Sequence, residues 1–257
     1  MYHRVNDALE PSDLVVPTAK FREQMIFLKQ HCGVVDVSRS NLVNQDSTSV
    51  KVAITFDDGY RDNYLNAYPV LKELRLPATI FLTTGMIGTD KKRPRYKDMA
   101  TPDMLSWEEV KEMTNNGITF GAHTVNHPRL SQLGYEEQKK EIQESMAVIS
   151  HKAARQQGEK MVFCYPYGDY NTDTLKILKD LGVDKAYTIK PGINEVARCK
   201  MQDARWDKQE QNLLELKRTE ISGVDSLFDF KKKLAGAFDF IHEFIQKKKG
   251  IWVPDVV

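Results

Sequence analysis

The sequence predicts an α/β fold, and more narrowly a single-domain distorted (β/α) barrel with seven or eight strands. Two observations lead to this prediction. Short apolar runs rich in β-branched and aromatic residues alternate with stretches whose apolar residues recur at helical spacing. The chain has 257 residues, and about 250 residues is the usual size of one such barrel. A doubly wound open sheet is the alternative arrangement that fits alternating strands and helices.

The predicted strands are seven runs whose composition suits a buried strand. They are residues 34–37, 50–56, 78–83, 118–123, 161–165, 185–189 and 216–221. No linker rich in glycine, proline or serine separates them, so residues 1–257 are predicted to form one domain.

Helices are predicted between these strands. Ser106 and Glu109 have the spacing of a capping box, and Gly117 supplies a stop signal after it. An apolar stripe at helical spacing predicts a helix after Thr18, with Thr18 as its cap. Three further helices are predicted, over residues 135–156, over the leucine-rich stretch that ends at Gly182, and over residues 225–246.

The composition excludes several classes of protein. The 37 lysines and arginines balance 36 aspartates and glutamates, whereas a general nucleic-acid binder carries a strong basic excess. We therefore expect no nucleic-acid partner. No apolar run approaches the ~20 residues of a membrane-spanning helix. The three cysteines lack CxxC spacing, which excludes a zinc ribbon. The sequence carries no signal for an oligomeric state.

The first residues lead to a prediction of localisation. They lack a charged region followed by an apolar one, so no signal peptide is recognised and the cytoplasm is favoured. Residues 1–5 nevertheless look like part of a strand. The cell envelope is therefore the alternative location, if an upstream segment has been removed.

Polar segments follow three of the predicted strands. They are Thr-Phe-Asp-Asp-Gly at 55–59, His-Thr-Val-Asn-His at 123–127, and Tyr-Pro-Tyr-Gly at 165–168. Taken singly, each also fits a plain turn or a structural role. In a parallel barrel, however, the carboxyl ends of all strands open on one face. We therefore expect the three segments to converge there.

The side chains of these segments suit a metal site. One aspartate and two histidines form a nitrogen and oxygen donor set that fits Zn²⁺ or a similar divalent ion. Three protein ligands leave one position for water, which is typical of a catalytic zinc site. The doublet Asp57-Asp58 can supply both a ligand and a second carboxylate that acts as a general base.

At these residues the chain resembles the polysaccharide deacetylase family, also called carbohydrate esterase family 4 or the NodB homology domain. Residues 55–59 match its first motif in full, and residues 123–127 match its second, His-(Ser/Thr)-x-x-His. Residues 165–168 look like its third motif. The opening Tyr2-His3 and the Phe-x-x-Gln stretch near Phe21 look most like the branch that deacetylates poly-N-acetylglucosamine.

The resemblance implies a role for each matching residue. Asp58, His123 and His127 are the expected ligands of a divalent metal, most simply Zn²⁺. Asp57 is the expected general base, which takes a proton from the attacking water. The backbone N–H of Tyr167 is expected to stabilise the tetrahedral oxyanion, where a preorganised donor contributes most. The expected substrate is an N-acetylated glycan or amino sugar.

Two departures from the family pattern carry further expectations. The third motif usually has an arginine two residues before its proline, where it orients the base, and this chain has Cys164 there. We expect another cation, Arg205 or Arg218, to replace it. The family's late Leu-x-His motif is absent, which makes His3 the candidate general acid. The alternative for His3 is a structural role, in which it satisfies a backbone group.

The sequence thus predicts a metal-dependent hydrolase that removes N-acetyl groups from amino sugars of a glycan. Two alternatives remain open at this point. One keeps the metal site and changes the substrate to a small non-sugar amide, imide or formamide. The other is a glycan-binding domain without catalytic activity. The absence of both the arginine and the late histidine favours this alternative slightly.

Overall fold

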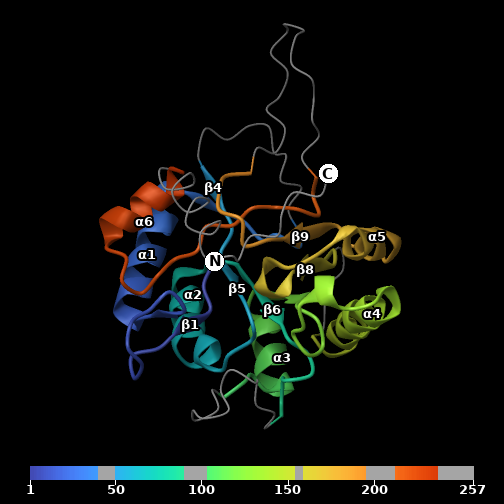
Figure 1. The fold of residues 1–257 in the computed structure, drawn as a ribbon. Coiled ribbons are helices and arrows are strands. Elements are labelled where there is room, and N and C mark those ends of the chain that lie inside the picture. Colours follow the sequence, from blue (N-terminus) through green and yellow to red (C-terminus); the bar gives the residue numbers. More distant parts are fainter. Residues whose placement is uncertain (40–49, 90–102, 154–158, 195–211, 237–257) are drawn as a thin grey trace, which may run out of the picture.

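Five parallel strands form the main sheet of the protein (Figure 1). The computed structural model describes residues 1–39, 50–89, 103–153, 159–194 and 212–236. The strands follow the chain in order, each hydrogen-bonded to the next, which confirms the α/β class and the parallel arrangement. They are β5 (Thr55–Phe56), β6 (Ala78–Leu82), β7 (Ile118–Ala122), β8 (Val162–Cys164) and β9 (Lys185–Tyr187).

Four short strands lie outside this sheet. Strand β1 (Arg4–Val5) pairs in parallel with β2 (Val15–Val16), and β3 (Gly33–Val34) pairs in parallel with β4 (Lys51–Val52). The predicted barrel with seven or eight strands is therefore not confirmed in its strand number, because the main sheet of the described residues has five. The sheet has five strands and is curled into a half-barrel.

The sheet stays open because its two edges meet the rest of the chain at single bridges. On one edge, Tyr2 pairs with Phe56 of β5, and on the other, Leu216 pairs with Tyr187 of β9. The Leu216 segment then reaches the N-terminal segment through two hydrogen bonds, from Ile221 N to Met1 O at 3.1 Å and from Met1 N to Thr219 O at 2.8 Å. The predicted strand at 216–221 is thus a bridged segment, and no continuous ladder closes the barrel among the residues that the structure describes.

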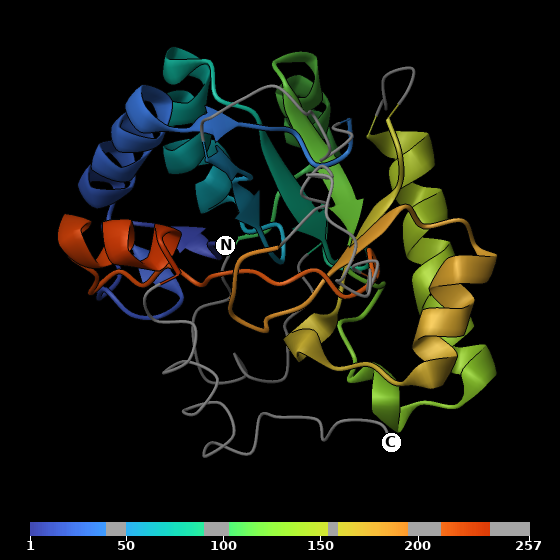
Figure 2. The same cartoon turned by 90° about the horizontal axis from the view of Figure 1, so that it is seen from above.

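Helices surround the outer side of the curled sheet, as the view from above shows (Figure 2). Strands that are linked in parallel need such crossovers, and the helices cover the sheet with their apolar faces. They are α1 (Thr18–His31), α2 (Tyr68–Leu74), α3 (Trp107–Asn115), α4 (Tyr135–Lys152), α5 (Thr172–Asp180) and α6 (Leu227–Leu234).

The local signals at α3 are confirmed. Glu109 N donates to Ser106 Oγ at 3.2 Å, and Ser106 N donates to Glu109 Oε2 at 2.9 Å, so the capping box is complete. Gly117 follows the end of the helix with φ +91°, a conformation that favours glycine. By contrast, Thr18 is the first residue of α1 and not its cap, which is Pro17.

The structure differs from the predicted helices at α6 and at α2. Helix α6 covers only the first part of the predicted 225–246, whose residues from 237 onward lie outside the described part of the chain. Helix α2 has no predicted counterpart. A π-helical turn, Asn63–Ala67, runs directly into it, so its sequence lacks a capping residue that marks a start.

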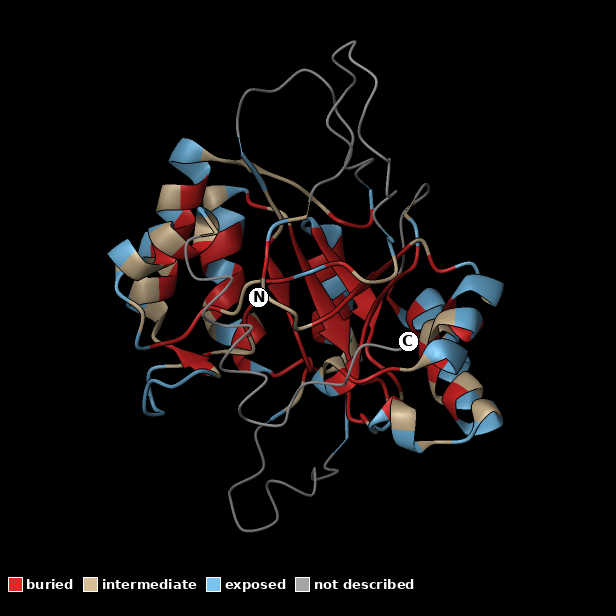
Figure 3. Cartoon of the chain, turned by 45° about the horizontal axis from the view of Figure 1, so that its top comes forward, coloured by how far each residue is buried: buried red, intermediate tan, exposed pale blue. Residues whose placement is uncertain are grey.

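The core lies between the sheet and the helices (Figure 3). Every residue of β6 and β7 is buried, which is expected for parallel strands covered on both faces. On helix α4, which lies within the predicted range 135–156, Ile142 and Ile149 are fully buried, and α4 packs on β7. The strand ends that carry the polar segments are therefore held on a close-packed support.

Candidate metal centre

The three polar segments converge at one edge of the sheet, as predicted. Asp58 follows β5, and His123 directly follows β7, and both strands end at the same edge because they are parallel. The donor atoms of Asp58, His123 and His127 all lie within 4.8 Å of one another, and all three residues are buried.

The spacing of these donor atoms fits a tetrahedral metal site. Asp58 Oδ1 lies 3.5 Å from His123 Nε2 and 3.3 Å from His127 Nε2. Two ligands that each lie about 2.0–2.2 Å from a tetrahedral ion are roughly 3.3–3.6 Å apart. The nitrogen and oxygen donor set is also the one that divalent ions such as zinc accept. These residues can therefore hold a divalent ion without rearrangement of the chain.

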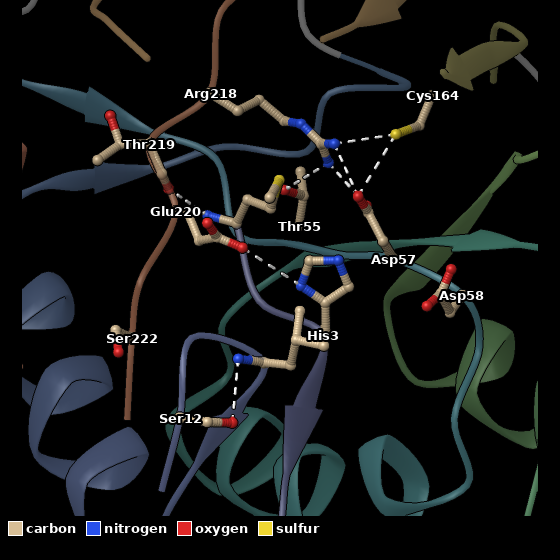
Figure 4. Close-up of polar contacts among 12 residues, drawn as sticks. His3, Ser12, Thr55, Asp57, Asp58, Cys164, Arg218, Thr219, Glu220 and Ser222 are labelled. Atoms are coloured by element: carbon tan, nitrogen blue, oxygen red, sulfur yellow. Dashed lines mark hydrogen bonds and ion pairs between the residues drawn. The ribbon is translucent and has the colours of Figure 1, made fainter. Parts of the chain in front are cut away.

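The backbone at the site is strained. Asp58 has φ +79°, His127 has φ +60° and Tyr167 has φ +60°, all in the left-handed region that residues with a side chain rarely occupy. Such strain persists only where the surrounding structure holds it, and it is common at functional sites. At the end of β5, the adjacent side chains of Asp57 and Asp58 point in different directions (Figure 4).

Cys164 orients one of the candidate ligands through its backbone. Its carbonyl oxygen lies 2.7 Å from His123 Nδ1. With Nδ1 donating its hydrogen to this carbonyl, Nε2 of His123 is left with a lone pair that faces Asp58 and His127. Metal-binding histidines are commonly held in this way.

Asp57 stands beside the donor set and is held by Arg218. Arg218 Nη1 donates to Asp57 Oδ1 and Nη2 donates to Oδ2, each at 2.7 Å, and both side chains are buried (Figure 4). Burial acts to raise the pKa of Asp57, but the charge and hydrogen bonds of Arg218 outweigh it and hold that pKa well below its usual range. Asp57 is thus an ionised carboxylate.

The guanidinium of Arg218 is itself fixed on two further sides. Its Nε donates to Thr188 O at 2.9 Å, and its Nη2 donates to Cys164 Sγ at 2.9 Å. Of the two cations expected to replace the missing arginine, Arg218 therefore reaches Asp57. Arg205 lies outside the described residues.

Cys164 completes this buried cluster as a neutral thiol. Its Sγ lies 3.5 Å from Asp57 Oδ2, and burial raises the pKa of the thiol. The small side chain at this position leaves the space beside Asp57 that the Arg218 guanidinium occupies.

His3 lies between Glu220 and the two carboxylates (Figure 4). The N-terminal segment runs beside β5, because Tyr2 N donates to Thr55 O at 2.8 Å and Asp57 N donates to Tyr2 O at 3.0 Å. His3 Nδ1 lies 3.8 Å from Glu220 Oε1 and has no hydrogen-bond partner among the described residues. This nitrogen therefore satisfies no backbone group in the described ranges of the chain.

Sequence reasoning missed Glu220. The signal was present in the alternation of the 216–221 segment, where residues two apart share a side. Arg218 and Glu220 are two apart, and they face Asp57 and His3 respectively.

Tyr167 lies against the donor set. Its ring packs edge-to-face on the His127 ring, with 4.5 Å between the centroids, and 38% of the residue is exposed. Arg129 stacks on the same ring at 4.6 Å. Tyr167 is thus at the border between the buried ligands and solvent.

No helix in the described part of the chain is both long enough and apolar enough to cross a membrane.

Comparison with known proteins gives consistent relatives. The Bacillus subtilis (strain 168) protein YxkH is 33% identical over 196 residues, which are 75% of this chain and 64% of that protein. A poly-beta-1,6-N-acetyl-D-glucosamine N-deacetylase of Staphylococcus aureus is 27% identical over 212 residues, 74% of this chain and 70% of that protein. The chain thus spans somewhat under two thirds of YxkH.

A solved structure has a similar fold over nearly the whole chain. The deacetylase PplD of Streptococcus pyogenes, in complex with acetate, superposes with a TM-score of 0.70 and 26% identity, covering 91% of this chain and 96% of that one. A family model described as polysaccharide deacetylase matches residues 44–186, which is more than half of the sequence. The motifs, the half-barrel and this match agree, and the chain belongs to the polysaccharide deacetylase family.

Proposed function

We propose that the protein is a metal-dependent hydrolase that removes N-acetyl groups from amino sugars of a glycan. The observation that carries the proposal is the buried set of Asp58, His123 and His127 with the ionised Asp57 directly beside it. The S. aureus relative, named for N-deacetylation of poly-beta-1,6-N-acetyl-D-glucosamine, supports the choice of substrate class.

The metal in this proposal is Zn²⁺, held by Asp58, His123 and His127. When bound, the ion supplies a Lewis acid that activates water and polarises the acyl carbonyl at neutral pH. The protein's part is to keep the three donors at tetrahedral spacing, with His123 fixed through the Cys164 carbonyl.

Asp57 acts as the general base. Its carboxylate is ionised and its two oxygens are held in one orientation by Arg218, so it can take a proton from the attacking water. A carboxylate that already served as a metal ligand could not do this as well. The two neighbouring aspartates therefore have separate tasks, and their different side-chain directions keep these apart.

His3 acts as the general acid that protonates the leaving amine. Imidazole gives and takes protons near neutral pH, and His3 is placed on the side of Asp57 that faces Glu220. The Glu220 carboxylate is the acidic group beside this imidazole, with its Oε1 3.8 Å from His3 Nδ1. The acid and the base thus come from two different segments of the chain.

The backbone N–H of Tyr167 is proposed to stabilise the oxyanion that forms from the acyl carbonyl. Support comes from the position of Tyr167 against His127, at the border of the buried donor set. A preorganised backbone donor at such a point contributes to the transition state without reorganisation.

Acetate release decides between this proposal and its alternatives. Zinc-loaded protein is offered chito-oligomers, poly-β-1,6-N-acetylglucosamine, and a panel of cyclic imides and formamides. We expect acetate from the glycans only. Turnover of the small amides alone would establish the other hydrolase, whereas tight glycan binding without turnover would establish a binding domain.

The variant Asp57→Asn sharpens this test. It keeps the shape of the side chain and removes the charge that accepts a proton. We expect the variant to retain zinc and to lose acetate release by about 10²–10⁴-fold, which is the usual contribution of a general base.

A further inference from the structure

Glu141 of α4 holds the turn that lies between the two candidate histidine ligands. Its Oε2 accepts hydrogen bonds from the backbone N–H groups of Val125 at 2.9 Å and of Asn126 at 2.8 Å. Its Oε1 accepts a third, from Asn126 Nδ2 at 2.6 Å. A single carboxylate therefore binds three donors in the stretch between His123 and His127.

The turn needs such support because its backbone is strained. Thr124 has φ +64° and His127 has φ +60°, and each conformation is unfavourable for a residue with a side chain. Turns that enter the left-handed region direct successive N–H groups toward one side, where they form a concave site for an anion. In this protein the anion is the carboxylate of Glu141. Charge-assisted hydrogen bonds of this kind are stronger than neutral ones.

The opposite side of the turn is fixed to the segment after β6. Thr84 N donates to Thr124 O at 3.1 Å, and Gly85 N donates to Val125 O at 2.9 Å. A Cβ atom at position 85 would lie only 2.7 Å from that carbonyl oxygen, so the two segments are in close contact. The carbonyl groups of the turn are thus held from β6, while its N–H groups are held from α4 by Glu141.

Glu141 projects from a rigid support. Its neighbour Ile142 is fully buried, and α4 packs on β7, the strand that leads into His123. The carboxylate therefore joins the helix behind β7 to the turn in front of it. His127 N also donates to Thr124 Oγ1 at 2.9 Å, which closes the turn on itself.

We propose that Glu141 is a positioning residue of the metal centre, which holds His127 at the separation from Asp58 and His123 that a divalent ion requires. The inference rests on the proposed function, because it takes these three residues to be the ligands. Glu141 acts on His127 through the backbone of the turn, without contact with the ion. Residues one shell away from metal ligands commonly change metal affinity by about 10–100-fold.

Zinc affinity tests this role directly, without a glycan. The proteins compared are the full-length wild type, Glu141→Ala, Glu141→Gln and the control Glu144→Ala. Glu144 is exposed one turn further along α4 and forms no hydrogen bond or ion pair within the described part of the chain. The Kd for Zn²⁺ is measured by competition with a chromophoric chelator. The visible spectrum of the Co²⁺-loaded proteins reports the ligand geometry.

We expect Glu141→Ala to raise the Kd for Zn²⁺ by about 10–100-fold and to change the Co²⁺ spectrum. Glu141→Gln keeps an acceptor oxygen without the charge and is expected to lie between this variant and the wild type. Glu144→Ala is expected to bind zinc as the wild type does. Circular dichroism of the metal-free proteins shows whether each variant is folded before zinc is added, which separates positioning from a general loss of structure.

Each outcome decides the inference. Wild-type zinc affinity and spectrum in Glu141→Ala would overturn it, as would an equal loss in Glu144→Ala. If Glu141→Ala does not fold, the isosteric Glu141→Gln carries the comparison. Acetate release is measured separately, so a wild type that binds zinc and releases no acetate refutes the deacetylase while the Kd ratio still decides the role of Glu141. A wild type that takes up no zinc overturns both.

Discussion

Arg218 and Asp57 form a buried, bidentate ion pair across 161 positions of the sequence. The Nη1 and Nη2 atoms of Arg218 each lie 2.7 Å from a carboxylate oxygen of Asp57, and neither side chain is more than 5% exposed. Such a pair has a large desolvation penalty, so its presence is weak evidence that it stabilises the fold. It is better explained as a means of holding a charge in position. The charge in question is the proposed general base.

Removal of Arg218 is expected to lower the stability of the protein as well as its rate of catalysis. Arg218→Met leaves the Asp57 carboxylate buried without its partner, and breaking a buried pair in this way costs about 3–5 kcal/mol. Lys217→Met is the matched control, because it removes a cation from the exposed neighbouring residue. Urea unfolding gives the free energies. Equal stability of the two variants would contradict the prediction.

The pH dependence of the reaction should show where Asp57 titrates. Arg218 holds the pKa of Asp57 well below the usual carboxyl value of about 3.9. Protonation of Asp57 is therefore not expected to limit kcat/KM of the wild type above about pH 4. In Arg218→Met, burial without the cation raises the pKa of Asp57, so the acid limb of the profile should move to higher pH. Superimposable limbs in the two proteins would refute this.

The same shift has a consequence for stability, with a definite sign. The pKa of Asp57 is lower in the folded protein than in the unfolded chain, so the unfolded chain binds more protons as the pH falls. The pair thus contributes its full stability above about pH 4, and this is lost progressively at lower pH. Acid unfolding is followed by circular dichroism. The stability of Arg218→Met should fall less steeply with decreasing pH than that of the wild type.

His3 and Glu220 should affect catalysis and leave metal binding intact. His3→Gln removes the proposed proton donor, and we expect kcat to fall by about 10²–10⁴-fold. Glu220→Gln keeps His3 and should cause a smaller loss. His31→Gln, in the exposed last turn of α1, is the control. Full activity of His3→Gln would contradict this prediction and favour a structural role for His3.

Metal content should distinguish the proposed metal ligands from the other histidines. His127→Ala is expected to lose zinc, because it leaves only two of the three protein ligands. His151→Ala, exposed near the end of α4, should retain it. Elemental analysis after dialysis measures both. Chelation should abolish acetate release in the wild type, and added zinc should restore it.

Local sequence patterns predict many of the secondary-structure elements and the main residues of the candidate site. The positions of the buried strands, the capping box at Ser106 and the three polar segments can all be read from short stretches of sequence. Convergence of Asp58, His123 and His127 also followed from the sequence, because parallel strands place their carboxyl ends at one edge. These features depend on backbone periodicity and strand direction, which neighbouring residues largely specify.

The tertiary structure decided the remaining contacts. Two arginines were open as partners of Asp57, and only the path of the 216–221 segment past the end of β9 brings Arg218 to it. The same path brings Glu220 to His3, and the packing of α4 on β7 brings Glu141 to the turn before His127. Packing between distant segments likewise determines what meets the two edges of the sheet, which are Tyr2 at β5 and Leu216 at β9. Each of these depends on how elements distant in sequence pack, which no local pattern of residues encodes.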